Sequence, residues 1–211
     1  MSNDTTVRVP QQARSIEKRN RLVDAAMALF GEKGFQGTNA KEIAGKAGVS
    51  VGTFYAYFTD KKALLLEILS RHMADVDAAV FEELRAMVRD GATGREMMRL
   101  TIRLGHDSHH HAPELLRIML AMRYTDEDFT RMVAVENRDM TAKIVGLLSA
   151  MGDNLRVTDL DAAARVVANA FEETMHSVAV FGPDIEQDRL YEALADMTAV
   201  YLFKDPDAPL K

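Results

Sequence analysis

The sequence predicts an all-α protein, because apolar residues recur at helical spacing through most of the chain and no segment alternates convincingly as a strand would. A second observation concerns the N-terminal third, where two very short helical segments are separated by Ala-Gly-Val-Ser at 47–50. Two short helices joined by such a turn are typical of a helix-turn-helix. A third is the long uninterrupted amphipathic segment 61–88, which predicts one helix linking an N-terminal domain to a larger C-terminal domain.

The first helix is predicted over residues 15–33, where one apolar stripe ends at Gly34. The stripe consists of Leu22, Val23, Ala26, Leu29 and Phe30. Residues 1–14 are expected to form a flexible N-terminal arm. The domain boundaries that follow are 1–14 for the arm, 15–60 for the helix-turn-helix domain and 61–211 for the C-terminal domain.

The helix-turn-helix has recognisable start and stop residues. Its first helix begins after Thr38 or Asn39, and Asn39 with Glu42 has the spacing of a capping box. Gly48 ends that helix, since glycine adopts a positive φ without a side-chain clash, and Ser50 starts the next one.

The second helix of the motif has two different faces. Phe54 and Phe58 share one side and are predicted to be core, while the outward side is small and hydrogen-bonding. Such a face fits a major groove, with a hydroxyl for base edges, Val51 near a thymine methyl and phenols for phosphates. Lys61 and Lys62 lie at the start of the following helix, where a phosphate is favoured.

The charge distribution agrees with this interpretation. The whole chain carries a net charge of −6, but residues 1–62 hold ten Lys and Arg against six acidic residues. The basic part is therefore the part that bears the motif, and it attracts a phosphate backbone while the acidic remainder repels it.

These residues carry a family resemblance: the chain resembles the DNA-binding domain of TetR-family transcriptional regulators. The matching positions are 30–38, 43–44, 47–50, 52–53, 55, 57–58 and 61–64. The resemblance implies an all-helical homodimer that binds a palindromic operator, with a C-terminal domain that binds a small effector. It also implies phosphate contacts by Thr38, Tyr55, Tyr57 and Lys61, and base contacts by Val51, Gly52 and Thr53. The candidate DNA-binding residues are Thr38, Lys41, Ser50, Val51, Gly52, Thr53, Tyr55, Tyr57 and Lys61.

The C-terminal domain is predicted to continue as helices over about 95–105, from Pro113 onward, and from Thr125 to about Gly152. Two further helices follow Thr158. Their apolar stripes are Val167, Phe171, Thr174, Val178 and Phe181 in one, and Leu190, Leu194, Met197 and Tyr201 in the other. Periodicity leaves two alternatives open for this hairpin, an intrachain core or a four-helix dimer interface, and the resemblance favours the dimer.

An apolar effector pocket is expected inside this domain, because flexible methionine side chains adapt to irregular ligands. The candidate ligand-binding residues are Met98, Ile102, Met119, Met122, Phe171, Met175 and His176. Core filling is the alternative role for each of them.

The histidine-rich run His106 to His111 is the one constellation that suggests metal chemistry, and an exposed polar loop is the preferred interpretation. We expect neither a metal site nor a cofactor. No catalytic motif is found, so the protein is not expected to be an enzyme. The absence of cysteine, of a signal peptide and of an 18-residue apolar run predicts a cytoplasmic protein without membrane contact.

Two functions remain after these exclusions. The first is a DNA-binding repressor released from an inverted-repeat operator by a small, mainly apolar effector. The alternative is a helical small-molecule or metal-binding protein whose helix-turn-helix is only structural.

Overall fold

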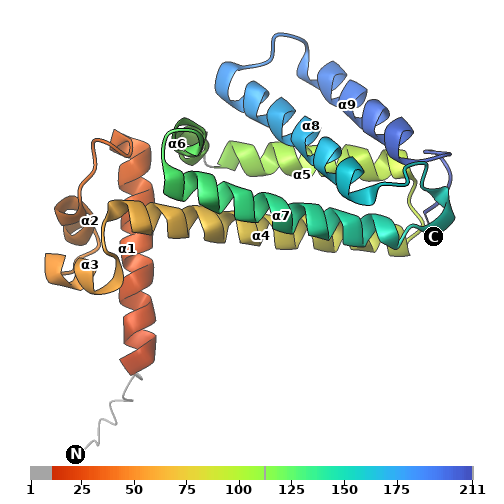
Figure 1. The fold of residues 1–211 in the computed structure, drawn as a ribbon. Helices are drawn as coiled ribbons and strands as arrows, with labels where there is room; N and C mark the ends of the chain where they lie inside the picture. The colour runs from red at the N-terminus through yellow and green to blue at the C-terminus, as the bar shows by residue number, and fades with distance from the viewer. Residues whose placement is uncertain (1–10, 112, 211) are drawn as a thin grey trace, which may run out of the picture. The chain divides into compact units, whose positions relative to one another are not determined.

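The computed structural model describes residues 11–111 and 113–210, which form an all-α fold (Figure 1). The helices are α1 (Gln11–Lys33), α2 (Ala40–Lys46), α3 (Val51–Tyr57), α4 (Lys61–Arg89), α5 (Gly94–His111), α6 (Pro113–Arg123), α7 (Glu127–Ser149), the short 3₁₀ helix η1 (Gly152–Asn154), α8 (Leu160–Phe181) and α9 (Gln187–Leu202). Extended pairing in the described ranges is limited to two isolated bridges, Thr93 with Pro209 and Leu155 with Phe203. The predicted fold class is confirmed.

The chain divides into two compact units inside α4, between Leu69 and Ser70. The first unit therefore includes the first turns of α4, which the sequence analysis had assigned to the C-terminal domain. The reason is packing, since Leu64, Leu65 and Ile68 are buried in the N-terminal core.

The N-terminal unit packs α2 against both α1 and α3. Its core consists of Leu22, Ala26, Leu29, Phe30, Ile43, Ala44, Phe54, Phe58, Leu64 and Leu65. The first helix begins at Gln11, so residues 11–14 of the expected arm are part of α1. Gln, Ala and Arg are strong helix formers, so nothing in this segment stops the helix before Ser15. The remaining arm residues, 1–10, lie outside the described part of the chain.

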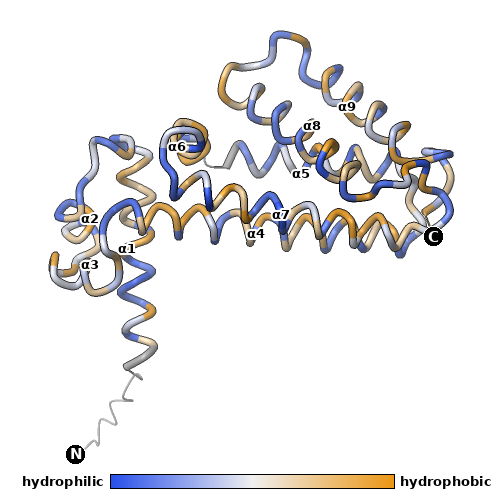
Figure 2. The backbone as a smooth tube through the Cα atoms, viewed as in Figure 1, coloured by the Kyte–Doolittle hydropathy of each residue, from blue (hydrophilic) through white to orange (hydrophobic). Residues whose placement is uncertain are grey.

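The C-terminal unit is built around α5, which contacts both α8 and α9, while α7 packs on α8. Figure 2 shows hydrophobic and hydrophilic stretches alternating along the helices, as amphipathic packing requires. The chain after α9 returns to α5: a Cβ on Gly94 would lie 2.4 Å from the ring of Phe203, so only glycine allows this approach. Leu210 N then donates to Ala92 O at 2.8 Å.

The histidine-rich run is helical, and the prediction of an exposed loop there was wrong. α5 continues through His106 to His111, because no breaker interrupts it before Pro113, and helices usually end at or before the residue that precedes a proline. His106 is half-buried, with its Nδ1 3.0 Å from the hydroxyl of Tyr191. The side chains of His110 and His111 lie outside the described part of the structure.

Among the helices described, none is both long enough and apolar enough to cross a membrane.

Candidate nucleic-acid interface

α2 is held at its start by a reciprocal capping box. Glu42 N donates to Asn39 Oδ1 at 3.0 Å, and Asn39 N donates to Glu42 Oε2 at 3.3 Å. Two backbone donors that have no partner within the helix are thereby satisfied. The predicted capping box is confirmed.

The turn between α2 and α3 also follows the sequence pattern. Gly48 has a φ of 65°, and Val49 N donates to Ala44 O at 3.0 Å. Ser50 caps α3, since its Oγ accepts from Thr53 N at 3.1 Å. Its Oγ also lies 2.9 Å from Thr53 Oγ1, so the two hydroxyls are neighbours at the exposed beginning of α3.

α3 presents the two faces that its sequence predicts. Phe54 and Phe58 are buried, whereas Val51 and Tyr55 are 37 % and 57 % exposed. Gly52 is also exposed, and a Cβ at this position would meet only Ser50 Oγ, at 3.8 Å. The packing of the chain itself therefore does not require a glycine at residue 52.

Three candidate DNA-binding side chains have partners inside the N-terminal unit. Thr38 is buried, and its Oγ1 donates to Gly34 O at 2.9 Å and to Leu29 O at 3.2 Å. Tyr57 has its hydroxyl 2.9 Å from Ser15 Oγ. These contacts tie the ends of α1, α2 and α3 together.

Lys61 is the third of them and the most strongly engaged. Its ammonium donates to Phe35 O at 2.7 Å and to Thr38 O at 2.8 Å, and it lies 4.4 Å from the centre of the Phe35 ring. Burial lowers the pKa of this lysine. Residue spacing could not reveal these contacts, because the carbonyls belong to a turn more than twenty residues earlier in the chain.

Other charges of this unit are also paired. Lys33 contacts Glu42 at 2.7 Å and Lys46 contacts Glu32 at 2.6 Å, so both pairs join α1 to α2. Lys41, in contrast, is exposed on α2 and has no hydrogen-bond or ion-pair partner among the described residues. Of the lysines predicted to contact DNA, Lys41 is therefore the one whose ammonium is not engaged by the unit itself.

The candidate ligand-binding residues are only partly brought together. Met98, Ile102 and Met175 belong to the core cluster of the C-terminal unit, and Phe171 packs against this cluster. His176 follows Met175 on α8 and is also buried. Met119 and Met122 are half-buried on α6 and do not belong to that cluster.

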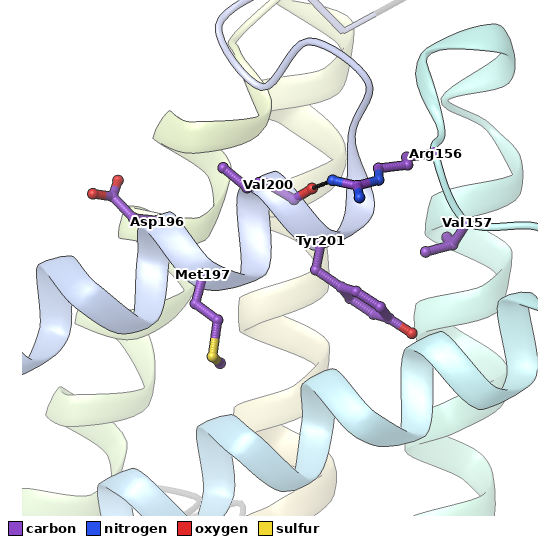
Figure 3. Close-up of a pocket in the computed structure, with 6 residues that line it drawn as sticks. All are labelled: Arg156, Val157, Asp196, Met197, Val200 and Tyr201. Carbon is purple, nitrogen blue, oxygen red and sulfur yellow. Dashed lines mark hydrogen bonds between the residues drawn. The ribbon is translucent and has the colours of Figure 1, made fainter.

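Most of the exposed large apolar residues of this unit lie on or beside α8 and α9. Met197, Val200 and Tyr201 of α9, with Val157 before α8, line an open hollow of about 560 Å³ (Figure 3). Arg156 borders it and donates from Nη1 to Val200 O at 3.1 Å. Further exposed apolar residues on or beside these helices are Val166, Phe181 and Ile185.

Apart from Phe181 at its end, the stripe predicted on α8 does not coincide with this outer surface. Val167 and Val178 are only 6 % exposed and face the core of the same chain. Helical periodicity identifies that two sides differ but not which side a second chain would cover.

In the residues that the structure describes, no group of three or more His, Cys, Asp or Glu side chains is placed to hold a metal ion.

A capped helix-turn-helix with a small exposed recognition face, followed by an all-helical C-terminal unit, defines a helix-turn-helix regulator class. Residues 22–68 match the model of bacterial regulatory proteins of the tetR family, and residues 95–202 match that of the tetracyclin repressor-like C-terminal domain. The chain belongs to the TetR family.

Two of the relatives with functional names are an activator and a repressor. The activator FasR of Mycolicibacterium smegmatis is 28 % identical over 134 residues, which cover 63 % of this chain and 59 % of FasR. The repressor KstR of Rhodococcus jostii is 28 % identical over 158 residues, covering 74 % of this chain and 69 % of KstR.

A solved structure shares the fold over nearly the whole chain. The Thermus thermophilus repressor FadR, crystallised in complex with lauroyl-CoA, superposes with a TM-score of 0.65 and 27 % identity, covering 92 % of this chain and 100 % of FadR.

Proposed function

We propose that this protein is a transcriptional repressor that binds an inverted-repeat operator as a homodimer and is released by a small, mainly apolar effector. The observation that carries the proposal is the exposed face of α3, where Gly52 has open space in front of it. A glycine inside a short helix costs about 1 kcal/mol relative to alanine, so its presence points to a partner that must approach the backbone.

The assignment of contacts follows from exposure. Val51, Gly52 and Thr53 at the start of α3 are proposed to meet base edges, and Ser50, Tyr55 and Lys41 to meet the backbone phosphates. Thr38, Tyr57 and Lys61 are proposed to hold α3 in place through the contacts described above.

The dimer is proposed to form through the exposed apolar side of α8 and α9. Val166, Met197 and Val200 are each about half exposed in the single chain, at 55 %, 56 % and 48 %. Exposed apolar patches of this kind mark interaction sites, and a two-fold axis makes such a patch self-complementary. A second copy is thus the proposed occupant of the hollow in Figure 3.

Two relatives support a repressing role and an apolar effector. KstR is named a repressor, and FadR is a repressor solved with lauroyl-CoA, whereas FasR is named an activator. The core cluster of the C-terminal unit contains methionines, whose flexible side chains adapt readily to apolar ligands.

The experiment that tests the function is selection of DNA from a random pool by the full chain, followed by sequencing. An enriched inverted repeat, with half-sites about 34–36 Å apart or a multiple of it, is expected. Failure to enrich any sequence would favour the alternative, a helical ligand-binding protein whose helix-turn-helix is only structural. The sense of regulation is then read from reporter expression driven through the selected site.

A further inference from the structure

His176 is a buried imidazole with an unsatisfied nitrogen. It lies on the inner side of α8 and is 7 % exposed. Within the described part of the chain, its Nδ1 has no hydrogen-bond partner. Folded proteins rarely leave a buried polar atom in this state, so each such atom calls for an explanation by function or by a bound partner.

The neighbour of His176 on α5 is a second histidine. The rings of His109 and His176 are 5.1 Å apart, centre to centre. His109 Nδ1 lies 2.7 Å from the carbonyl oxygen of Gly105, which can only accept, so this nitrogen carries the proton. The ring of His109 is therefore oriented by its own helix, beside the ring of His176.

The charged side chain of Arg123, the last residue of α6, acts on His176. The pKa of His176 is lowered to about 4 by burial, then by His109 and Arg123, so its imidazole is neutral at pH 7. Glu172 lies one turn earlier on α8, and burial raises the pKa of its carboxyl group despite Arg123 and Arg165. A neutral imidazole and a guanidinium can both donate hydrogen bonds.

Apolar side chains adjoin this polar cluster on the same two helices. Phe171 and Met175 of α8 precede the two polar residues, and Met98 and Ile102 of α5 belong to the same core. Opposite Met175 stands Gly105, where a Cβ would lie 3.7 Å from Met175 Cγ. No side chain of α5 stands between the helices at that point, and the flexible thioether of Met175 is able to move aside.

We propose that His176 Nδ1 is the polar anchor of an effector site between α5 and α8, and that it binds an oxygen acceptor, a carboxylate or carbonyl, on an otherwise apolar molecule. This inference rests on the proposed function, because it presupposes an effector. It adds the chemical class of the effector and the atom that recognises it. An ammonium is disfavoured at the same position by the positive charge of Arg123.

The test uses calorimetry with the full chain and three probes of equal chain length: decanoate, methyl decanoate and decylamine. Wild-type protein should bind the acid and the ester and should bind the amine at least tenfold more weakly. His176→Leu should weaken both acceptor probes about tenfold, the loss expected for one buried hydrogen bond. His176→Asn, whose amide reaches the position of Nδ1, should recover most of the affinity, and Ser177→Ala on the exposed side of α8 should bind as wild type.

Two further measurements keep the test decisive. Removing an unsatisfied polar atom should leave the melting temperature of unliganded His176→Leu unchanged or higher. In wild-type protein, decanoate should shift the ¹⁵N resonance of one buried imidazole nitrogen, which requires no variant to fold. Equal binding by wild type and His176→Leu, no binding of the acceptor probes by wild type, or an unshifted resonance would each overturn the proposal.

The outcome for operator binding is independent of this one. If the protein binds its operator but its affinity for decanoate is the same with and without His176, only the proposed anchor is refuted. Decanoate binding through His176 in a protein that selects no DNA refutes only the proposed regulator.

Discussion

Gly52 is the residue whose role is easiest to isolate, because its surroundings are open. Its position on α3 allows a Cβ without a clash, so the fold tolerates alanine. Lys61 is the opposite case, a residue with carbonyl partners on two sides. A substitution of Gly52 therefore tests DNA binding, whereas a substitution of Lys61 tests the stability of the fold.

Gly52→Ala should stabilise the protein and weaken operator binding. The alanine methyl adds about 0.5–1 kcal/mol of helix stability, but it occupies the space through which the backbone approaches base edges. Chemical denaturation and fluorescence anisotropy with a labelled operator measure the two effects. Gly31→Ala, on the exposed side of α1 with nothing within 4 Å, is the matched control and should gain stability without losing affinity. Unchanged affinity in Gly52→Ala would remove this residue from the interface.

Lys61→Met should destabilise the N-terminal unit without altering the salt dependence of DNA binding. The substitution leaves the carbonyls of Phe35 and Thr38 without their donor, which costs about 1–3 kcal/mol. Lys41→Met is the comparison, since loss of one phosphate contact should lower the slope of log affinity against log salt by about 1. The reverse result, a lower slope and full stability for Lys61→Met, would make Lys61 a phosphate ligand.

At the scale of elements, α8 carries two different apolar faces, a buried histidine and a half-buried glutamate. Its inner face, with Val167, Met175 and Val178, belongs to the core, while Val166 and Phe181 are exposed. His176 lies among the inner residues and Glu172 lies one turn earlier, and their pKa values are moved in opposite directions. These two side chains of α8 therefore make the free energy of unfolding depend on pH.

Stability should fall as the pH is lowered from about 6.5 to about 4. His176 is neutral in the fold down to a pKa of about 4, whereas the unfolded chain takes up the proton at its ordinary value near 6.5. The contribution is complete above pH 6.5 and its loss reaches at most about 3 kcal/mol at the lower end. The raised pKa of Glu172 acts in the opposite sense, since its contribution is present at low pH and is lost as pH rises.

Denaturation curves at pH 7 and pH 5 measure this dependence, comparing wild type with His176→Leu. The leucine variant should lose less stability between the two values. His72→Gln, which changes a histidine of α4 outside the cluster, should follow wild type. An identical pH dependence in wild type and His176→Leu would contradict the assignment to His176.

At the scale of the whole molecule, the question is what covers the exposed side of α8 and α9. Arg95 and Arg99 of α5 pair with Asp196 and Glu192, so the polar side of α9 is already satisfied within the chain. The apolar side that includes Met197 and Val200 is not. A two-fold dimer would bury it and place two copies of α3 for the two halves of an operator.

Val200→Asp should therefore split the dimer while the single chain stays folded. A carboxylate in a closed apolar interface would be left without a partner, whereas in the single chain it faces solvent. Sedimentation should show a monomer, with helical content unchanged and operator affinity strongly reduced. Val178→Asp serves as the contrast, because Val178 is buried in the chain's own core and its replacement should unfold the C-terminal unit. A Val200→Asp protein that remains dimeric would place the interface elsewhere.

The sequence by itself determined most of the helices, the capping box at Asn39 and the turn at Gly48, because these depend on residues only a few positions apart. It also determined the two faces of α3. Only the tertiary structure decided that Lys61 and Thr38 are engaged by backbone carbonyls, that His176 faces His109, and which side of α8 is core. The physical reason is that periodicity gives the spacing of side chains along one helix, whereas their direction and partners depend on packing against segments far away in the chain.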